Sequence, residues 1–203
     1  MLLERALLAA GVMVPVLYYG ALLVTPLFWP GYSHVTQYAS ELGSAASPQP
    51  ALFNRAIVAA GVAAMLAGGG FFLALKRIGG RPLASFLAGL AVFAWGVAFL
   101  MGGLFPMPDP RHGAFGLALA LHLAPPFMLW ALAGTPAPRL KPFLVLVFVV
   151  SGALILIMFD VGALHLVRRA NVGLWQRAYG LSIIPWVGVV AGVLMAWPPA
   201  PGR

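Results

Sequence analysis

Cysteine is absent from this chain of 203 residues, and acidic residues are rare: four Asp and Glu stand against twelve Lys and Arg. Without cysteine the chain cannot form disulfides, thiolate metal sites, iron–sulfur clusters or a cysteine nucleophile. Charged residues of both signs make up only 8% of the sequence, whereas a soluble domain has roughly 25%. Because 62% of the residues are hydrophobic, the composition indicates a membrane protein.

The net charge of +8 raises the question of nucleic-acid binding. The basic residues, however, are scattered at the ends of apolar segments and form no single patch. We therefore expect anionic membrane lipid, and not nucleic acid, as the partner of these charges.

Six apolar segments are each long enough to cross a bilayer, whose core about 30 Å thick requires about 20 residues of helix. The sequence therefore predicts an all-α polytopic bundle of six transmembrane helices, which forms a single integral membrane domain over residues 1–203. The six segments cover approximately residues 6–29, 51–75, 83–106, 113–134, 143–167 and 178–198.

The distribution of basic residues predicts the orientation of this bundle. The two termini and the two short loops on their side carry seven Lys and Arg residues, against five on the other side. The positive-inside tendency then places both termini in the cytoplasm and the chain in the cell membrane. The seven residues are Arg5, Lys76, Arg77, Arg81, Arg139, Lys141 and Arg203.

Glycine and proline inside the segments indicate how the helices pack. Paired glycines share a helix face in three segments and would let helix backbones approach closely. Prolines interrupt the first, fourth and sixth segments and predict kinks there. The glycine pairs are Gly61 with Gly68, Gly89 with Gly96 and Gly188 with Gly192, and the prolines are Pro15, Pro125, Pro126 and Pro185.

Most of the chain's chemistry falls on the side away from the termini, which we call the outer side. It holds all four histidines and three of the four acids. The first outer loop, residues 31–50, is the longest connection, and its first part can form a short interfacial helix. In that helix His34, Tyr38 and Glu41 would share one face, either lining a site or facing water.

Five arginines also lie on the outer side, against the positive-inside tendency. Either their side chains reach lipid phosphates at headgroup level, or they form a pocket that grips a phosphate or carboxylate bidentately. Together with the loop stripe, they give a predicted ligand-binding set: His34, Tyr38, Glu41, Arg55, Arg111, Arg168, Arg169 and Arg177.

Two polar residues are predicted to lie deeper in the membrane. At 1.5 Å per residue, His122 and Asp160 would sit roughly 10–15 Å below the outer surface. A lone carboxylate in hydrocarbon costs several kcal/mol and requires a partner, a proton or a water-filled cavity. The sequence therefore predicts a buried polar pair of these two residues, with either a structural or a functional role.

An enzymatic site would have to use the same outer residues. His112 and His165, at the outer ends of neighbouring helices, could bind one zinc ion together with a carboxylate, although no HExxH motif is present. Serine hydrolysis would require a serine beside a histidine that a carboxylate orients. The candidate catalytic residues are Ser40, Glu41, Asp109, His112 and His165, and the weak candidates for metal ligands are His112 and His165.

Three motifs carry a resemblance to a known family: YSHVTQYASELGSAASPQPALFNRA over residues 32–56, FPMPDPRHG over 105–113 and NVGLWQRAYG over 171–180. They are similar to the hallmarks of a prokaryotic family of six-helix membrane proteins catalogued as domain of unknown function 998. The similarity spans essentially the whole chain, and its most specific part is residues 40–43, followed by Ser47, Pro48 and Asn54. The resemblance implies the fold and topology and supplies no activity. The chain departs from the family pattern at Gln176, where the family has Glu.

A fainter similarity is to the membrane hydrolase superfamily that includes alkaline ceramidases, whose zinc sites combine Ser, Asp and three His. This chain lacks the HxxxH pair of those sites.

These observations favour a non-catalytic, multi-pass membrane protein with an outward-facing polar pocket capped by the first outer loop. We expect it to bind a lipid or other anionic amphiphile without a cofactor, or to act as an accessory subunit of a membrane-protein partner. The alternative is an intramembrane, zinc-assisted lipid hydrolase that uses His112, His165 and a carboxylate.

Overall fold

The computed structural model describes residues 1–162 and 164–198, and within them the chain is all-helical with no strand. Six helical segments in this part of the chain are long and apolar enough to cross a membrane, which confirms the predicted six-helix fold. The elements are α1 (Leu2–Val24), η1 (Thr25–Phe28), η2 (Ala39–Gly43), α2 (Pro50–Arg77), α3 (Pro82–Leu104), η3 (Pro110–Leu123), α4 (Ala124–Ala131), α5 (Leu140–Met158), α6 (Val172–Ile183) and α7 (Pro185–Ala196), where η denotes a 3₁₀ helix.

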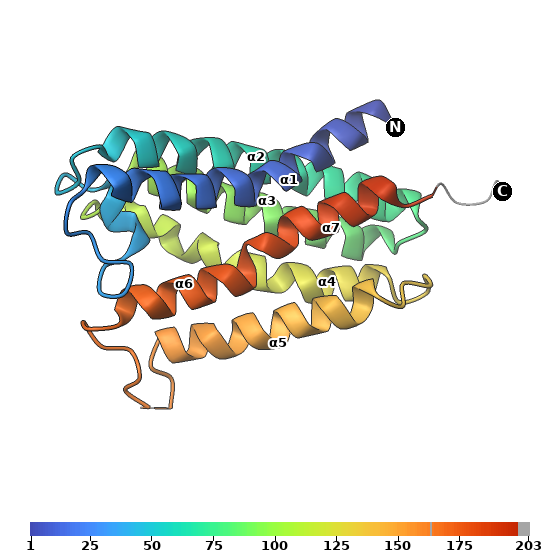
Figure 1. Ribbon diagram of the computed structural model, residues 1–203. Coiled ribbons are helices and arrows are strands. Elements are labelled where there is room, and N and C mark those ends of the chain that lie inside the picture. The colour runs from blue at the N-terminus through green and yellow to red at the C-terminus, as the bar shows by residue number, and fades with distance from the viewer. Residues whose placement is uncertain (163, 199–203) are drawn as a thin grey trace.

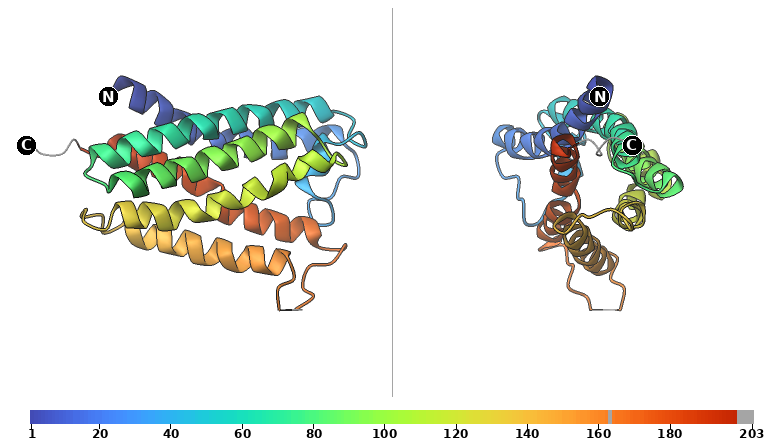
Figure 2. Two further views of the ribbon diagram at one scale, coloured as in Figure 1. Left: turned by 180° about the vertical axis from the view of Figure 1, so that it is seen from behind. Right: turned by 90° about the vertical axis from the view of Figure 1, so that its right-hand side faces the viewer.

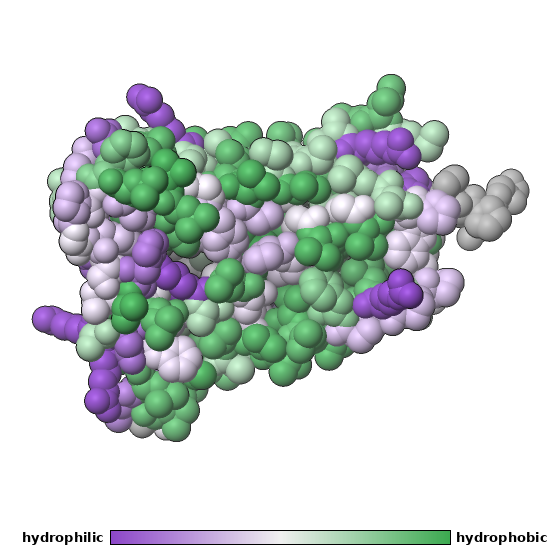
Figure 3. Space-filling view, viewed as in Figure 1, coloured by the Kyte–Doolittle hydropathy of each residue, from purple (hydrophilic) through white to green (hydrophobic). Residues whose placement is uncertain are grey.

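The helices lie side by side along one axis, as Figures 1 and 2 show. α1 begins and α7 ends at the same end of the bundle, while the long first outer loop lies at the opposite end (Figure 1). α5 lies at the edge of the bundle. Hydrophobic side chains dominate the middle of the visible face and hydrophilic ones gather toward its two ends, as a membrane-spanning bundle requires (Figure 3). Arg203, one of the seven basic residues on the side of the two termini, lies outside the residues that the structure describes.

The fifth span ends earlier than the sequence predicts. α5 stops at Met158, nine residues before the expected end, and the chain turns with Asp160 at φ +52° and Gly162 at φ +93°. Because Val161, Leu164 and Leu166 continue the apolar run beyond this turn, hydropathy alone extends the helix too far. Asp160 therefore leaves the membrane-spanning helix and lies in the loop that follows it.

Prolines divide two of the spans as predicted. α6 and α7 meet at Pro185, and α4 begins just before Pro125 and Pro126. Near the outer end of η3 the backbone adopts left-handed conformations at residues 114–116. Pro15, in contrast, lies within an uninterrupted α1.

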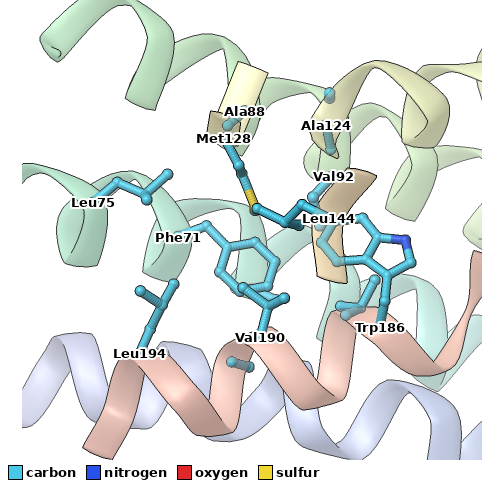
Figure 4. Packing of buried hydrophobic residues seen from close by; sticks show 14 of the residues in the cluster. Phe71, Leu75, Ala88, Val92, Ala124, Met128, Leu144, Trp186, Val190 and Leu194 are labelled. Atoms are coloured by element: carbon cyan, nitrogen blue, oxygen red, sulfur yellow. The ribbon is translucent and has the colours of Figure 1, made fainter. Parts of the chain in front are cut away.

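The hydrophobic core lies between α1, α2, α3, α4, α5 and α7. Phe71 stacks against Trp186 at 6.3 Å between ring centroids, and Met128 and Leu144 enter the same cluster from α4 and α5 (Figure 4). At its glycines, the contact between α2 and α3 brings the two helix backbones together. A Cβ built on Gly68 would lie 2.5 Å from the Gly89 carbonyl oxygen.

Gly61 and Gly96 make the same kind of close approach, with 2.8 Å between a Cβ built on Gly61 and the Gly96 carbonyl oxygen. This confirms the packing role predicted for both glycine pairs of α2 and α3. In α7, Gly188 packs against the ring of Pro15, whereas a Cβ on Gly192 would meet nothing within 4 Å. Among the residues that the structure describes, Gly192 is therefore not a packing glycine.

Arg77 joins three helices at the terminal end of the bundle. Its Nε–H donates to Glu4 Oε1 at 2.8 Å, its Nη2 to the Leu194 carbonyl at 2.8 Å and its Nη1 to the Trp197 carbonyl at 3.1 Å. The carbonyls at the end of a helix have no partner within the helix. The single guanidinium therefore caps α7 and fastens it to α1 and α2.

We expect Gly68→Ala to lower the thermal stability of the purified protein in detergent. The added methyl group would meet the backbone of α3, which cannot yield without separating the helices, at a cost of about 1–3 kcal/mol. Gly152→Ala is the matched control, because a Cβ there meets nothing within 4 Å. Removing a helical glycine without a clash should leave stability unchanged or raise it by up to about 1 kcal/mol. Equal melting temperatures for the two variants would contradict the packing role of Gly68.

The predicted orientation can be tested with single cysteines, since the chain has none of its own. Ala46 in the first outer loop and Ala133 in the loop before α5 are both exposed, at opposite ends of the bundle. With cytoplasmic termini, an impermeant maleimide should label Ala46→Cys in intact cells and Ala133→Cys only after lysis. The opposite pattern would reverse the orientation.

Candidate functional site

The first outer loop does not form the helix that its spacing suggested. Residues 33–37 make a turn in which Gln37 Oε1 accepts a hydrogen bond from the Ser33 amide at 2.9 Å. The 3₁₀ helix η2 begins only after Tyr38, whose amide donates to Glu41 Oε1 at 2.8 Å. Side chains that bond to nearby backbone compete with helical hydrogen bonds. His34, Tyr38 and Glu41 therefore do not share one helix face.

Arg177 of α6 holds this loop against the bundle. Its Nε–H donates to His34 Nδ1 at 3.0 Å, its Nη1 to the carbonyl oxygens of Gln37 at 2.8 Å and Gly173 at 2.9 Å, and its Nη2 to the Tyr32 hydroxyl. We call Tyr32, His34, Gln37, Gly173 and Arg177 the outer latch. Because four guanidinium hydrogen bonds go to the protein itself, Arg177 organises the loop and is not a free cation for a ligand.

The latch also requires close backbone contact between the loop and α6. A Cβ on Gly173 would lie 2.6 Å from the His34 carbonyl oxygen, and the Leu174 amide donates to the Val35 carbonyl at 3.0 Å. Any side chain at position 173 would push the loop away from α6.

A second tight contact joins the end of η2 to α2. The Asn54 side-chain amide donates to the Gly43 carbonyl at 2.8 Å, and a Cβ on Gly43 would collide with the Asn54 side chain. Gly43 and Asn54 both belong to the most specific motif of the sequence. Their spacing is thus explained by the way the loop is seated on α2.

His34 is neutral in the outer latch. Because Arg177 donates to its Nδ1, this nitrogen accepts, and the ring proton resides on Nε2. Burial and then the charge of Arg177 lower the pKa of His34, whereas burial raises the pKa of Tyr32. At neutral pH the imidazole therefore acts as a hydrogen-bond acceptor.

A cavity of about 250 Å³ lies where the first outer loop meets α1, α2, α3, α6 and η3. Phe53, Ile57 and Phe99 form an apolar part of its wall. None of its lining residues is charged. Its polar lining side chains are Tyr18, Ser40, Asn54, His112 and Gln176.

Two of these polar side chains, His112 and Gln176, each bond to the protein through one polar atom and have a second polar atom available to a ligand. His112 bonds through Nδ1 to the Phe105 carbonyl at 3.0 Å. A carbonyl only accepts, so Nδ1 carries a proton, and in this Nδ1–H tautomer Nε2 carries a lone pair. Gln176 Oε1 accepts from the Ala39 amide at 2.6 Å, which leaves the two N–H donors of its side chain. The cavity thus offers both a donor and an acceptor.

Of the predicted catalytic residues, only Ser40 and His112 line this cavity. Glu41 accepts from Gln37 Nε2 at 3.1 Å within the loop. Asp109 pairs with Arg111 at 2.7 Å, and this hydrogen bonding lowers the pKa of Asp109 to about 2. Over the described ranges, no group of three His, Asp or Glu side chains is placed to hold a metal ion.

The fifth catalytic candidate, His165, is bound to Asp160. Its Nδ1 lies 2.7 Å from Asp160 Oδ2, and its amide donates to Asp160 Oδ1 at 2.7 Å. The structure therefore does not bring Asp160 to His122, because the end of α5 at Met158 leaves Asp160 in the loop. His122 instead stacks on Tyr179 at 5.6 Å between ring centroids, with both ring nitrogens buried and unpaired among the described side chains.

The remaining arginines divide into two kinds. Arg111 stacks over the Phe105 ring at 3.8 Å besides pairing with Asp109, and Arg168 donates to the His165 carbonyl at 3.3 Å. Arg55 and Arg169 are exposed, and their side chains make no hydrogen bond or ion pair within the part of the chain that the structure describes. Arg55 directly follows Asn54 of the cavity wall, so it is the better candidate of the two for contact with a ligand in the cavity.

The sequence did not single out Tyr18 or Phe99 as site residues, since both lie inside apolar spans. Their rings stack at 5.6 Å between centroids at the cavity wall. A phenol within an otherwise apolar segment is the one signal that would have pointed to Tyr18.

We expect Arg177→Lys to loosen the first outer loop, because one ammonium cannot bond Tyr32, His34 and Gln37 together. Loss of hydrogen bonds to a charged group should cost about 1.5–3 kcal/mol of stability, measured by thermal unfolding in detergent. Limited proteolysis should also cut residues 29–49 faster. Arg169→Lys is the control, since Arg169 is exposed and outside the latch. If both variants resist protease equally, the latch does not hold the loop.

The comparisons with known proteins agree with this architecture. The sequence profile of a family described as "Protein of unknown function (DUF998)" matches residues 12–193, a range that reaches into all six spans. No curated protein and no solved structure matches the chain. Because the profile covers most of its length, this chain belongs to the DUF998 family of membrane proteins, as its motifs suggested.

Proposed function

We propose that this protein binds the polar end of an amphiphile, such as a lipid of the outer leaflet, in the cavity beneath the first outer loop. The observation that carries the proposal is the lining of the cavity, where an apolar wall of Phe53, Ile57 and Phe99 meets uncharged donors and acceptors. Sites for small molecules are mostly apolar, with a few polar groups that fix orientation.

The size of the cavity indicates how much of the ligand it holds. Pockets that bury a drug-sized molecule measure about 300–1,000 Å³. A cavity of about 250 Å³ therefore takes only part of an amphiphile, while the rest lies in the bilayer. We infer that Gln176 donates to the ligand and that His112 accepts through Nε2 from a hydroxyl group of the ligand.

An anionic headgroup fits the charges around the cavity. Arg55 and Arg111 directly follow and precede the lining residues Asn54 and His112, and both arginines are exposed. Arg111 already pairs with Asp109, so Arg55 is the cation that a phosphate or carboxylate would meet. This assignment narrows the arginine set predicted from the sequence to one principal member.

The hydrolase alternative receives less support. Ser40 and His112 line the same cavity, but the Ser40 hydroxyl donates to Met107 Sδ at 3.1 Å. His112 Nδ1 bonds a backbone carbonyl where a catalytic triad has a carboxylate. His165, the second proposed zinc ligand, is paired with Asp160. An accessory role beside a membrane-protein partner stays a prediction.

Filling the cavity tests the binding proposal. Gly102 lies on its wall, and a Cβ there would be in ordinary van der Waals contact with His112, whose Cε1 is the nearest atom at 3.8 Å, so we expect Gly102→Leu to fill part of the space. We expect a photoactivatable fatty acid to crosslink to cavity peptides of the wild-type protein and to lose most of this labelling in Gly102→Leu.

Gly152→Leu on α5 makes the same change in a place where a Cβ meets nothing within 4 Å, and it should retain the labelling. Both variants should show a single thermal transition in detergent, which verifies that they fold. Undiminished labelling of cavity peptides in Gly102→Leu would contradict binding in this cavity.

A further inference from the structure

A second and larger cavity lies at the opposite end of the bundle. It is a groove of about 640 Å³ between the start of α5 and the last turns of α7. Leu140, Phe143, Val189 and Val193 form its apolar walls, and Trp197 lies at its end. Tryptophan is typical of the membrane–water interface, so the groove extends from that interface into the hydrocarbon region.

The interfacial end of the groove is electropositive. Arg139 is its one charged lining residue and stands at the N-cap of α5, followed by Lys141 in the first turn. The dipole at the start of this 19-residue helix adds positive potential. Within the described residues the acid of this end is Glu4, and it is already paired with Arg77. Among the described side chains, therefore, no unpaired acid compensates Arg139.

One wall of the groove is fixed by the core contacts already described. Arg77 donates to the carbonyls of Leu194 and Trp197, so the last turn of α7 cannot shift to close the space. On the other side, Leu140 and Leu144 are buried and anchor the start of α5. A groove between two anchored walls stays open to an occupant from the bilayer.

We propose that this groove is a specific site for one anionic phospholipid of the leaflet on the side of the termini. The phosphate lies against Arg139 and the start of α5, and an acyl chain lies along Phe143, Val189 and Val193. Lipid is the occupant that supplies both an apolar chain and a negative charge at the interface. This site is separate from the outer cavity and does not depend on the function proposed for it.

Lipid competition observed by native mass spectrometry tests the site. Wild-type protein in mild detergent, mixed with equal amounts of phosphatidylglycerol and phosphatidylcholine, should retain one phosphatidylglycerol with about fivefold preference, the factor expected when one basic residue attracts a lipid of net negative charge. Arg139→Gln should abolish most of this preference. Lys76→Gln, which removes a charge held over Phe72 on α2, should keep it.

A second pair of variants tests the groove itself. Val193→Trp fills the space and should remove the retained phospholipid of either type, whereas Val149→Trp, on the exposed face of α5, should retain it. Equal preferences in Arg139→Gln and Lys76→Gln would overturn the proposal. So would a dimer whose interface includes the groove, detected as doubled mass that Val193→Trp abolishes. Gly102→Leu should leave this preference intact, which separates the site from the outer cavity.

Discussion

The structure depends on one constraint of the bilayer: carbonyls at helix ends and charged side chains near hydrocarbon must find partners inside the protein. Two arginines meet much of this requirement. Arg77 caps α7 and joins it to α1 and α2 at the terminal end. Arg177 joins the first outer loop to α6 at the outer end. In both places a planar group with five donors bonds several acceptors on segments that lie far apart in the sequence, which a lysine cannot do.

The same constraint accounts for three of the five arginines at the end of the bundle away from the termini. Arg177 bonds the loop, Arg111 bonds Asp109 and stacks on Phe105, and Arg168 donates to a loop carbonyl. Each of these charges has a local partner. Their presence on this side is therefore a property of the folded loops, and it is no sign by itself of an anion-binding pocket.

The six spans and the glycine contacts between α2 and α3 could be predicted because hydropathy and helical periodicity depend on residues near in sequence. The end of α5 could not, since Val161 and Leu164 continue the apolar pattern while the backbone has already turned at Asp160. That error placed Asp160 beside His122. The helix predicted for the first outer loop was also wrong. Helical periodicity gives no sign that the side chains of Gln37 and Glu41 accept hydrogen bonds from nearby backbone amides. Long-range contacts such as Arg177 with His34 leave no local signal.

The residues of the sequence motifs fall into two groups: those that the folded first outer loop requires, and those that it does not require. Gly43, Asn54, Gly173 and Arg177 are required for the first outer loop to sit on α2 and α6, whatever the protein binds. The bond between Gln176 Oε1 and the Ala39 amide belongs with them, since a glutamate carboxylate could accept it equally well. No structural bond of this kind requires the Nε2 of His112, which lines the cavity while its Nδ1 holds the Phe105 carbonyl. The cavity is therefore where this chain carries polar chemistry that its architecture does not need.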